Sequence, residues 1–379
     1  MLNDYMISSN PFTPQSGWEP KIFGGRSREL EIFKSNLDDA LDARPSHLIV
    51  LGEWGVGKTS LLKQFRRMSQ ENGFPAAFCG ISKFTEKNKA LDAIHLIAEE
   101  MVMGFPKTDA VEKDLLELFS KRKSLSNAQV QFTKFLLELW KTLDTKLAVV
   151  LLDDVQNLIE VSNTIDILRA VLSSEDVIKD TRFLFILSST PLGWASFIDK
   201  HDPVGRFFRK RLNAENLKES EVMATIDMTL KGTGVVFEEG IRKNIFKYTG
   251  GHPYEVQLLA SHLYDSQIEG RVKTDSWDNA LNNTLKELGR DYFDYLLSKA
   301  SDREKDLLKI LAEEKRPITI KDFTTMMIVG KRAKKFPIAN IKNFLYRLEE
   351  KGLVRRMENS GFYIQDLMFS EFIARSASE

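Results

Sequence analysis

The segment Gly52-Glu53-Trp54-Gly55-Val56-Gly57-Lys58-Thr59 decides how the rest of this sequence is interpreted. It follows the apolar run His47–Leu51 and precedes an amphipathic stretch, Lys58–Gln70, so it lies where a strand turns into a helix. It matches the pattern G-x-x-x-x-G-K-[ST], in which glycines let the backbone wrap around phosphate oxygens and a helix amino terminus adds positive potential. We therefore expect this loop to bind the phosphates of a nucleotide.

Two side chains of the loop have predicted roles of their own. Lys58 is expected to reach the β- and γ-phosphates, and the Thr59 hydroxyl is expected to ligate Mg²⁺. The backbone supplies the other contacts, because exposed N–H groups attract anions. The predicted phosphate contacts come from Gly52, Trp54, Gly55, Val56, Gly57, Lys58, Thr59 and Ser60.

A second apolar run, Leu147–Leu152, ends in Asp153-Asp154 and has strand length. Ligands of parallel sheets bind at the carboxyl ends of the strands, where these acids would lie. Asp153 is expected to hold Mg²⁺ through water, and Asp154 to orient or polarise the attacking water. The alternative is that the two acids simply begin a surface loop.

A third run, Phe183–Ser188, continues into Ser189-Thr190-Pro191. A polar residue at this point, next to Asp153, is suited to sensing the γ-phosphate. Thr190 is the first candidate and Ser189 the second. A strand-end turn or a helix cap is the competing interpretation for both residues.

Strands and helices alternate through the first part of the chain, which predicts a parallel sheet covered by helices. Two helices, near Ala110–Ser120 and Asn127–Leu143, look like an insertion. From about Asn216 the strands are expected to stop, and Glu219–Glu287 is interpreted as a helical bundle. The expected fold class is α/β: a P-loop NTPase core, with an ASCE-type parallel sheet sandwiched by helices, followed by a helical lid and a winged-helix domain.

The C-terminal pattern predicts the winged helix. Ser301-x-x-Glu304 is a capping box that opens a first helix. Two further helices and a hairpin follow, which is the element order of this fold. The predicted segments are Thr319–Met327, Ile338–Lys351, Leu353–Met357 and Phe362–Gln365. The expected domain boundaries are 1–215, 216–292 and 293–379.

Composition restricts the possible functions. The 379 residues carry 54 basic and 54 acidic side chains, so the chain as a whole has no electrostatic attraction to nucleic acid or membrane. The one cysteine, Cys79, excludes an internal disulfide. The longest apolar runs have strand length and are too short to cross a bilayer. A cytoplasmic protein without a membrane association is expected.

The ordered set of motifs resembles the AAA+-related ATPases of the archaeal and bacterial type, which lie between the origin-recognition ATPases and the STAND signalling ATPases. Besides the loop and Asp153-Asp154, the resemblance rests on four segments along almost the whole chain. These are Asn10-Pro-Phe12, Phe23-Gly-Gly-Arg26-x-x-Glu29-Leu30, Gly205-Arg206 and Gly250-Gly-His-Pro253.

The resemblance implies further roles. Phe23 and Gly24, within Ile22–Arg26, would border the adenine, and Pro253 and Tyr254 of the lid would cover the nucleotide. Arg206 or Arg209 would face the γ-phosphate, in the same chain or in a neighbouring subunit. A solvated basic run is the alternative for these arginines.

Two departures from the family pattern matter. Replication initiators carry an arginine in the lid motif, whereas this chain has Gly251-His252-Pro253, which is closer to the STAND branch. Many AAA+ proteins have glutamate where this chain has Asp154, so hydrolysis of ATP to ADP is expected to be slow.

A local basic cluster suggests double-stranded DNA as a partner. Between Lys331 and Arg356 the sequence has nine Lys or Arg and two acids. The predicted DNA contacts are Lys342, Tyr346 and Arg347 on the third helix and Arg355 and Arg356 on the wing. In the competing view, the winged helix is a regulatory clamp and its basic face is only solvated surface.

Three hypotheses follow from these motifs. The first is an ATPase whose nucleotide state controls assembly, as a homo-oligomer or with a protein partner, and DNA association. The second is a STAND-like signalling or defence switch that acts on a protein without binding DNA. The third is a metabolic kinase, for which the sequence has no substrate-specific lid motif.

Overall fold

The computed structural model divides the chain into two compact units, which we call the sheet unit (Gln15–Asn216) and the helical unit (Met1–Pro14 with Leu217–Glu379). The chain therefore passes between the units twice. The structure describes residues 9–15, 19–42, 45–85, 89–106, 117, 125–200, 202–329, 340–358 and 361–376.

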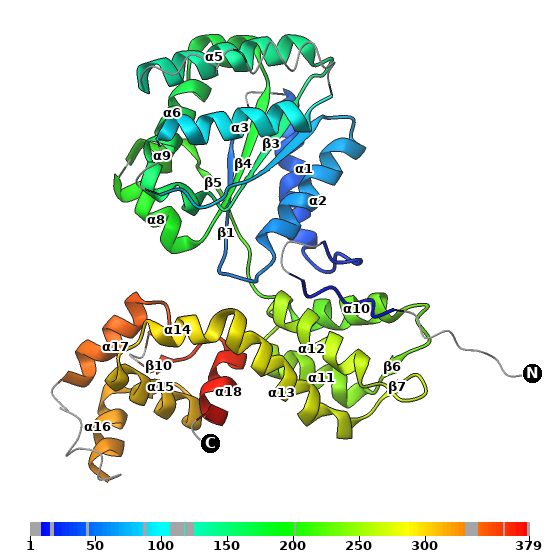
Figure 1. Ribbon diagram of the computed structural model, residues 1–379, viewed down its shortest axis with the longest axis vertical. Coiled ribbons are helices and arrows are strands. Elements are labelled where there is room, and N and C mark those ends of the chain that lie inside the picture. Colours follow the sequence, from blue (N-terminus) through cyan, green and yellow to red (C-terminus); the bar gives the residue numbers. More distant parts are fainter. Residues whose placement is uncertain are drawn as a thin grey trace, which may run out of the picture. The chain divides into compact units, whose positions relative to one another are not determined.

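The sheet unit alternates strands and helices (Figure 1). Its elements are α1 (Ser27–Asp42), β1 (Leu48–Leu51), α2 (Lys58–Glu71), β2 (Ala76–Gly80), α3 (Ala90–Gly104), α5 (Leu125–Thr142), β3 (Ala148–Asp153), η1 (Val155–Val161), α6 (Asn163–Leu172), α7 (Glu175–Asp180), β4 (Phe183–Ser189), α8 (Pro191–Lys200), α9 (Asp202–Phe207) and β5 (Lys210–Asn213). The helix predicted at Ala110–Ser120 lies outside the described residues, apart from Glu117.

The five strands pair in the order β2-β3-β4-β1-β5, and all of these pairs are parallel. Successive side chains of a strand point to opposite faces, and both faces are covered. Val149 and Leu151 of β3 pack in the core formed with α1 and α2, whereas Val150 and Leu152 pack in the core formed with α3, α5 and α6. This arrangement confirms the predicted sheet between two layers of helices.

One buried histidine supports the middle of the sheet. His47 precedes β1, and its Nδ1 atom accepts a hydrogen bond of 3.1 Å from the backbone N–H of Phe185 in β4. The rings of Phe207 and Phe208 lie 5.0 and 5.9 Å from it. Burial lowers the pKa of His47 to about 4, so the imidazole is neutral at physiological pH.

The helical unit contains helices and several short strands. Its elements are α10 (Glu219–Leu230), β6 (Val236–Phe237), α11 (Glu239–Thr249), α12 (Pro253–Asp265), β7 (Arg271–Val272), η2 (Thr274–Ser276), α13 (Trp277–Leu288), η3 (Gly289–Phe293), α14 (Asp294–Ser298), α15 (Asp302–Glu314), β8 (Ile318–Thr319), α16 (Ile320–Val329), α17 (Ile341–Glu350), β9 (Arg355–Arg356), β10 (Gly361–Tyr363) and α18 (Leu367–Ser376).

The expectation that strands stop at Asn216 is wrong. β6 and β7 form a two-stranded parallel sheet beyond that point. At two residues each, they are too short to show an alternating pattern in the sequence. The edge strand β5 was also missed, because only Leu212 of its four residues is buried and the others are polar.

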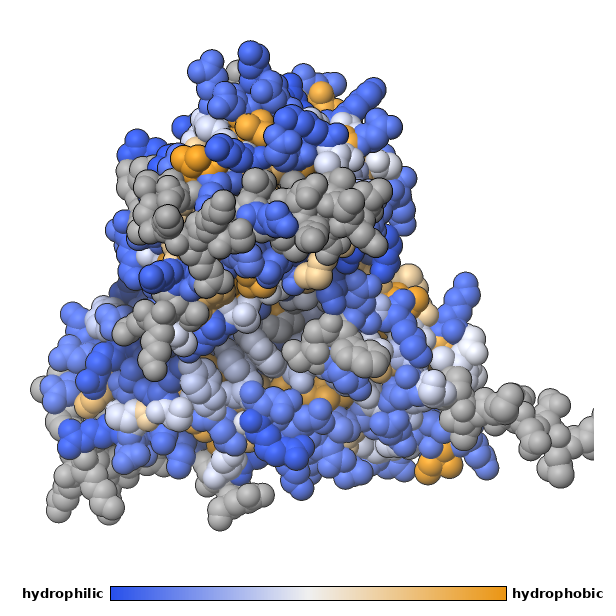
Figure 2. All heavy atoms as spheres, turned by 45° about the horizontal axis from the view of Figure 1, so that its top comes forward, coloured by the Kyte–Doolittle hydropathy of each residue, from blue (hydrophilic) through white to orange (hydrophobic). Residues whose placement is uncertain are grey.

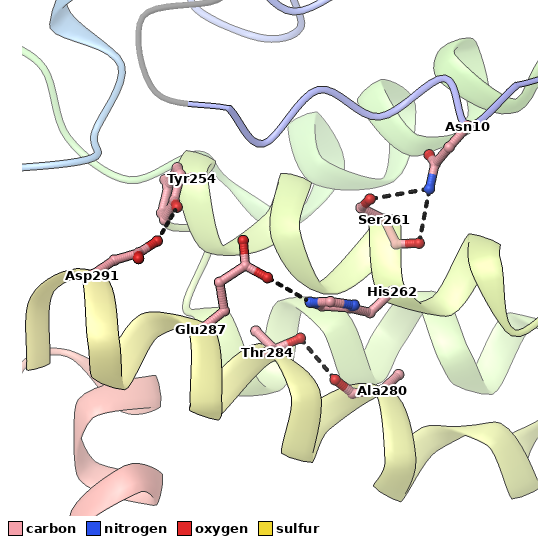
Figure 3. A network of polar contacts seen from close by, with 8 residues as sticks. All are labelled: Asn10, Tyr254, Ser261, His262, Ala280, Thr284, Glu287 and Asp291. Atoms are coloured by element: carbon pink, nitrogen blue, oxygen red, sulfur yellow. Dashed lines mark hydrogen bonds and ion pairs between the residues drawn. The ribbon is translucent and has the colours of Figure 1, made fainter.

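The N-terminal boundary also differs from the expected core of 1–215, because residues 9–14 belong to the helical unit. Phe12 is buried there, with its ring stacked on Phe237 at 6.0 Å and edge-on to Tyr264 at 6.2 Å. The Asn10 amide donates to the carbonyl and the hydroxyl of Ser261, both at 3.0 Å (Figure 3). Burial of one aromatic ring and these hydrogen bonds hold this segment against α12.

Residues 302–376 form a sheet of order β8-β10-β9 with helices around it. The sequence did not predict β8, which pairs antiparallel with β10. α18 joins this segment to the rest of the helical unit, since Phe369 and Phe372 lie 5.2 and 5.5 Å from the ring of Phe293 in η3.

The coloured residues on the face drawn in Figure 2 are mostly hydrophilic, with small scattered hydrophobic groups. Exposed large apolar side chains include Met103, Leu192 and Ile268. Within the described part of the chain, no helix combines the length and the apolar character that a membrane span requires.

Candidate functional site

The loop between β1 and α2 has the backbone of a phosphate cradle. Gly55 and Gly57 adopt left-handed conformations with φ of 75° and 88°, which non-glycine residues rarely tolerate. A Cβ atom at Gly52 would lie 2.6 Å from Val56 and 2.8 Å from the Ala214 carbonyl oxygen. The glycines are therefore required by the course of the loop itself.

Lys58 is buried at the first position of α2. Its ammonium donates a hydrogen bond of 3.0 Å to the carbonyl oxygen of Glu53 within the loop. Burial lowers the pKa of Lys58, and the nearby carboxylates of Asp154 and Asp153 partly oppose this shift. The loop therefore already holds a desolvated cation beside the positions expected for phosphate.

Thr59, Asp153 and Ser188 form a chain of hydrogen bonds at the carboxyl edge of the sheet. The Thr59 hydroxyl donates to Asp153 Oδ2 at 2.6 Å, and the Ser188 hydroxyl donates to Oδ1 at 2.5 Å. Burial raises the pKa of Asp153, while the hydrogen bonds from Ser188 and Thr59 act in the opposite direction. Both predicted Mg²⁺ residues therefore meet in one place.

The donor set fits Mg²⁺ better than a metal enclosed by protein ligands. Mg²⁺ binds through one or two protein oxygens and completes its shell with water and substrate phosphates. Thr59 and Asp153 offer oxygens of this kind. Among the residues that the structure describes, no cluster of three or more His, Cys, Asp or Glu suits a metal ion.

Asp154 has an unusual backbone for a non-glycine residue, with φ of 58°. Its N–H donates to the Ser188 hydroxyl at 2.9 Å, and its Oδ1 accepts from the Gln156 amide at 2.9 Å. These contacts fix the carboxylate directly after β3. A strained conformation held by defined partners is common at functional sites.

Thr190 and Ser189 differ in what their hydroxyls do. The Thr190 hydroxyl accepts a hydrogen bond of 3.1 Å from the Gly193 N–H and so caps the start of α8. The Ser189 hydroxyl is buried and makes no hydrogen bond within the described residues. Of the two predicted sensors, Ser189 has the hydroxyl that a ligand would satisfy.

Arg206 and Arg209 are exposed just before β5. In the register of the sheet, Lys210 pairs with Leu48 at the start of β1, whereas the loop follows its end at Leu51. The arginines therefore lie at the opposite edge, separated by a strand length of about 10 Å or more. This position gives no support to action on the nucleotide of the same chain.

The remaining predicted nucleotide contacts fall in both units. Phe23 packs against the α1–α2 core beside Gly24. Pro253 and Tyr254 begin α12 in the helical unit, where the Tyr254 hydroxyl bonds to the Asp291 carboxylate at 3.2 Å (Figure 3). Burial and Asp291 raise the pKa of Tyr254 to about 12. For the predicted contacts Phe23, Gly24, Pro253 and Tyr254, binding to a nucleotide stays a prediction.

Two of the predicted DNA contacts, Lys342 and Arg356, lie against the ring of a third, Tyr346. The Lys342 ammonium lies 5.7 Å and the Arg356 guanidinium 5.3 Å from its centroid, and Arg356 also donates to its hydroxyl at 3.1 Å. Arg347 pairs with the buried Glu304 at 3.3 Å. Arg355, on the same strand as Arg356, donates to Gln365 at 2.9 Å. Lys331, Arg332, Lys334 and Lys335 lie outside the described residues.

Two residues of the site, Ser188 and Gln156, were given no role by the sequence, and a third, Arg26, was expected to border the adenine as part of Ile22–Arg26. Ser188 was noted as a strand residue, and Gln156 gave no signal, because their partners are set by the pairing of β3 with β4. Arg26 lay in a motif that was noted, but its contact with the loop was not foreseen. Its guanidinium donates to the carbonyl oxygen of Val56 at 2.7 Å.

The strand order, the loop and the acid at the end of β3 together define an AAA+ ATPase of the P-loop class. The chain belongs to the family of ATPase domains found predominantly in Archaea, whose model matches residues 23–259.

The solved structures that share the fold include two that align with nearly the whole chain. A Walker-type ATPase of Pyrococcus abyssi is 13% identical, with a TM-score of 0.61 over 94% of this chain and 97% of that chain. The ORC2 protein of Aeropyrum pernix, solved with ADPNP and ADP, is 15% identical, with a TM-score of 0.64 over 97% of this chain and 98% of that chain. No curated protein matches the chain.

Proposed function

We propose that the protein binds Mg·ATP, hydrolyses it slowly, and uses its nucleotide state to control its assembly and its association with double-stranded DNA. The observation that carries the ATPase part is the meeting of Lys58, Thr59 and Asp153 at one edge of the sheet. An ammonium and a carboxylate-bound metal at one phosphate group are the recurring elements of phosphoryl transfer.

The proposed mechanism assigns a role to each group. Lys58 neutralises charge on the β- and γ-phosphates. Thr59 and Asp153 would hold Mg²⁺, which would supply further neutralisation of the phosphate charge when bound. Asp154 orients the attacking water. Its shorter side chain, compared with glutamate, is the basis for the slow rate that we propose.

The DNA part rests on the exposed cations of α17 and β9. We interpret residues 302–376 as a winged helix with α17 as its third helix. Lys342, Arg347, Arg355 and Arg356 are exposed on α17 and β9. Arginine and lysine side chains bind phosphates, and an aromatic hydroxyl can do so as well, so this surface suits the DNA backbone. Such binding should weaken steeply with salt, because counterions are released.

Assembly is proposed from the position of Arg206. Since it is exposed at the edge opposite the loop of its own chain, its contribution to phosphoryl transfer would be made in a neighbouring subunit. The nucleotide-dependent form would then be a homo-oligomer.

The test is fluorescence anisotropy with a labelled DNA duplex, with ADP, with a non-hydrolysable ATP analogue, or without nucleotide. We expect salt-sensitive binding whose affinity differs between nucleotide states. The pair Lys342→Glu and Arg355→Glu should weaken it by about tenfold or more, since each charge reversal removes a phosphate contact. Lys309→Glu, which reverses an exposed charge on α15, is the matched control. Lys58→Ala should abolish the nucleotide dependence.

The second candidate is a STAND-like switch that acts on a protein partner. It is favoured by the pairing of Arg347 and Lys351 with Glu304, at 3.3 and 2.7 Å, which neutralises part of the basic surface. If no duplex binds in any nucleotide state at low salt, the DNA proposal is wrong. A change of molar mass between ADP and the ATP analogue, measured by light scattering, would then support the switch.

A further inference from the structure

Arg26 combines burial with a strained backbone. Its φ is 67°, and it follows Gly25 with φ of 69°, so two successive residues are left-handed. The conformation is unfavourable for a non-glycine residue, whereas glycine would adopt it freely. The side chain is also 7% exposed, so a guanidinium has been taken out of water. Both features indicate that the side chain is required at this position.

The guanidinium of Arg26 contacts the phosphate loop and the first turn of α1. Nη2 donates to the carbonyl oxygen of Val56 at 2.7 Å, and Nη1 pairs with Glu29 Oε1 at 3.0 Å. Glu29 lies in the first turn of α1, and Val56 lies in the phosphate loop, 30 residues from Arg26. A planar guanidinium suits this task, because its donors lie in a rigid fork.

The contact with Val56 sets the direction of a peptide group in the loop. In a trans peptide the C=O and N–H bonds point in opposite directions. When Arg26 holds the Val56 carbonyl, the N–H of Gly57 must point away from Arg26. Gly57 precedes Lys58, and its N–H is one of the donors that this motif aims at phosphate. Without the arginine, the same peptide group could rotate and present its oxygen to the anion.

We propose that Arg26 is a positioning residue for the phosphate cradle: it orients the Val56–Gly57 peptide so that the N–H faces the nucleotide phosphates. The proposal rests on the proposed nucleotide binding. It gives Arg26 a different task from bordering the adenine, since its contact is with the loop. Glu29 holds the guanidinium in place, and it compensates the buried charge.

The test compares Arg26→Met with the unaltered protein by calorimetry, with ADP and with inorganic tripolyphosphate as ligands. Methionine keeps much of the volume and removes both donors. We expect both affinities to fall by about tenfold or more, the effect of losing one charged hydrogen bond. Arg28→Met is the matched control, because Arg28 is an exposed arginine two residues away. It should change neither affinity by more than about twofold.

The two ligands separate the possible outcomes. If Arg26→Met binds ADP within twofold of the unaltered protein, the proposal is wrong. If ADP binding weakens while tripolyphosphate binding does not change, Arg26 acts on the base side and the proposal is also wrong. If the unaltered protein binds no ADP, nucleotide binding itself fails and this inference fails with it.

A second variant guards against loss of folding. Arg26→Lys keeps the charge but replaces the fork with a single ammonium, which we expect to give an affinity between those of the methionine variant and the unaltered protein. If Arg26→Met shows no cooperative thermal transition, the proposal is tested with Arg26→Lys, whose affinities for ADP and tripolyphosphate are compared with those of the unaltered protein. An Arg26→Lys protein that binds both ligands as tightly as the unaltered protein would contradict the need for two donors.

Discussion

At the scale of single residues, the site depends on side chains whose position is set by a few short contacts. Asp154 is the clearest case. Its backbone is left-handed, and its N–H and Oδ1 are held by Ser188 and Gln156. A carboxylate held this firmly next to Asp153, the acid proposed to bind Mg²⁺, is suited to orienting water. The hydrogen bonds of Lys58 and Thr59 are made to Glu53 and Asp153 instead.

Asp154→Asn should therefore separate turnover from binding. The asparagine oxygen can still accept from Gln156, so the local structure should be kept, but the charge that polarises water is lost. We expect ATP turnover to fall by about a hundredfold or more, the usual contribution of a catalytic base, with nucleotide affinity kept. A coupled phosphate-release assay and calorimetry measure the two quantities. Glu160→Gln, an exposed carboxylate of η1, is the control. Unchanged turnover in Asp154→Asn would remove the role that we assign to this residue.

At the scale of elements, the start of α12 links the lid motif to the C-terminal segment. His252 and Pro253 occupy the N-cap and the first turn of the helix. Glu255 follows and is buried, with Asp366, just before α18, as its neighbour. The His252 Nδ1 atom lies 3.7 Å from the Glu255 carboxyl group. Burial first, and then Asp366, raises the pKa of Glu255 well above its ordinary value.

The raised pKa makes stability depend on pH through Glu255. The folded state keeps the proton, whereas the unfolded state loses it above a pH of about 4.5, the ordinary pKa of a glutamate side chain. The contribution of Glu255 to the free energy of unfolding is therefore fully present below pH 4.5. It is lost as the pH rises toward the pKa of Glu255 in the folded protein, by at most about 1.4 kcal/mol per pH unit.

Glu255→Gln should stabilise the helical unit by an amount that grows between pH 5 and 8, because glutamine imitates the protonated acid. Urea unfolding followed at several pH values measures the difference between the two proteins. Glu313→Gln, an exposed acid on α15, is the control and should show a small difference that does not vary with pH. A constant difference for Glu255→Gln would mean that Glu255 is ionised in the folded protein.

At the scale of the whole molecule, the N-terminal segment and the C-terminal part of the chain form one compact unit, the helical unit. Residues 9–14 pack in the helical unit, and the sheet unit is inserted between them and Leu217. Phe12 is 3% exposed and lies among α12 and β6 residues of that unit. The sheet unit is thus connected to the helical unit at both of its ends.

Phe12→Ala should weaken the helical unit selectively. Removal of a buried phenylalanine ring costs about 3–5 kcal/mol. Hydrogen exchange followed by mass spectrometry should show faster exchange in α11 and α12, with β1, β3 and β4 unchanged. Met103→Ala, which truncates a side chain that is 63% exposed, is the control. Equal effects on strands and helices would contradict the division into two units.

Local patterns of residues were enough to predict the phosphate loop, the buried strand that ends in Asp153 and the layering of helices on a parallel sheet. These features depend on neighbouring residues, because strand, turn and helix patterns are local and can be recognised within about fifteen positions. The element types of the helical unit were predicted in outline for the same reason. Its two-residue strands were missed, because they are too short to carry a period.

Contacts between residues far apart in the chain became known from the three-dimensional fold and not from the sequence. The pairing of β4 with both β1 and β3 brings Ser188 to Asp153, and a fold of the chain before α1 brings Arg26 to Val56. The contacts of Phe12 with Phe237 and of Glu255 with Asp366 likewise join residues far apart in the chain. Such contacts depend on strand order and on complementary shape between segments far apart in the chain, and no local pattern of residues encodes either of them.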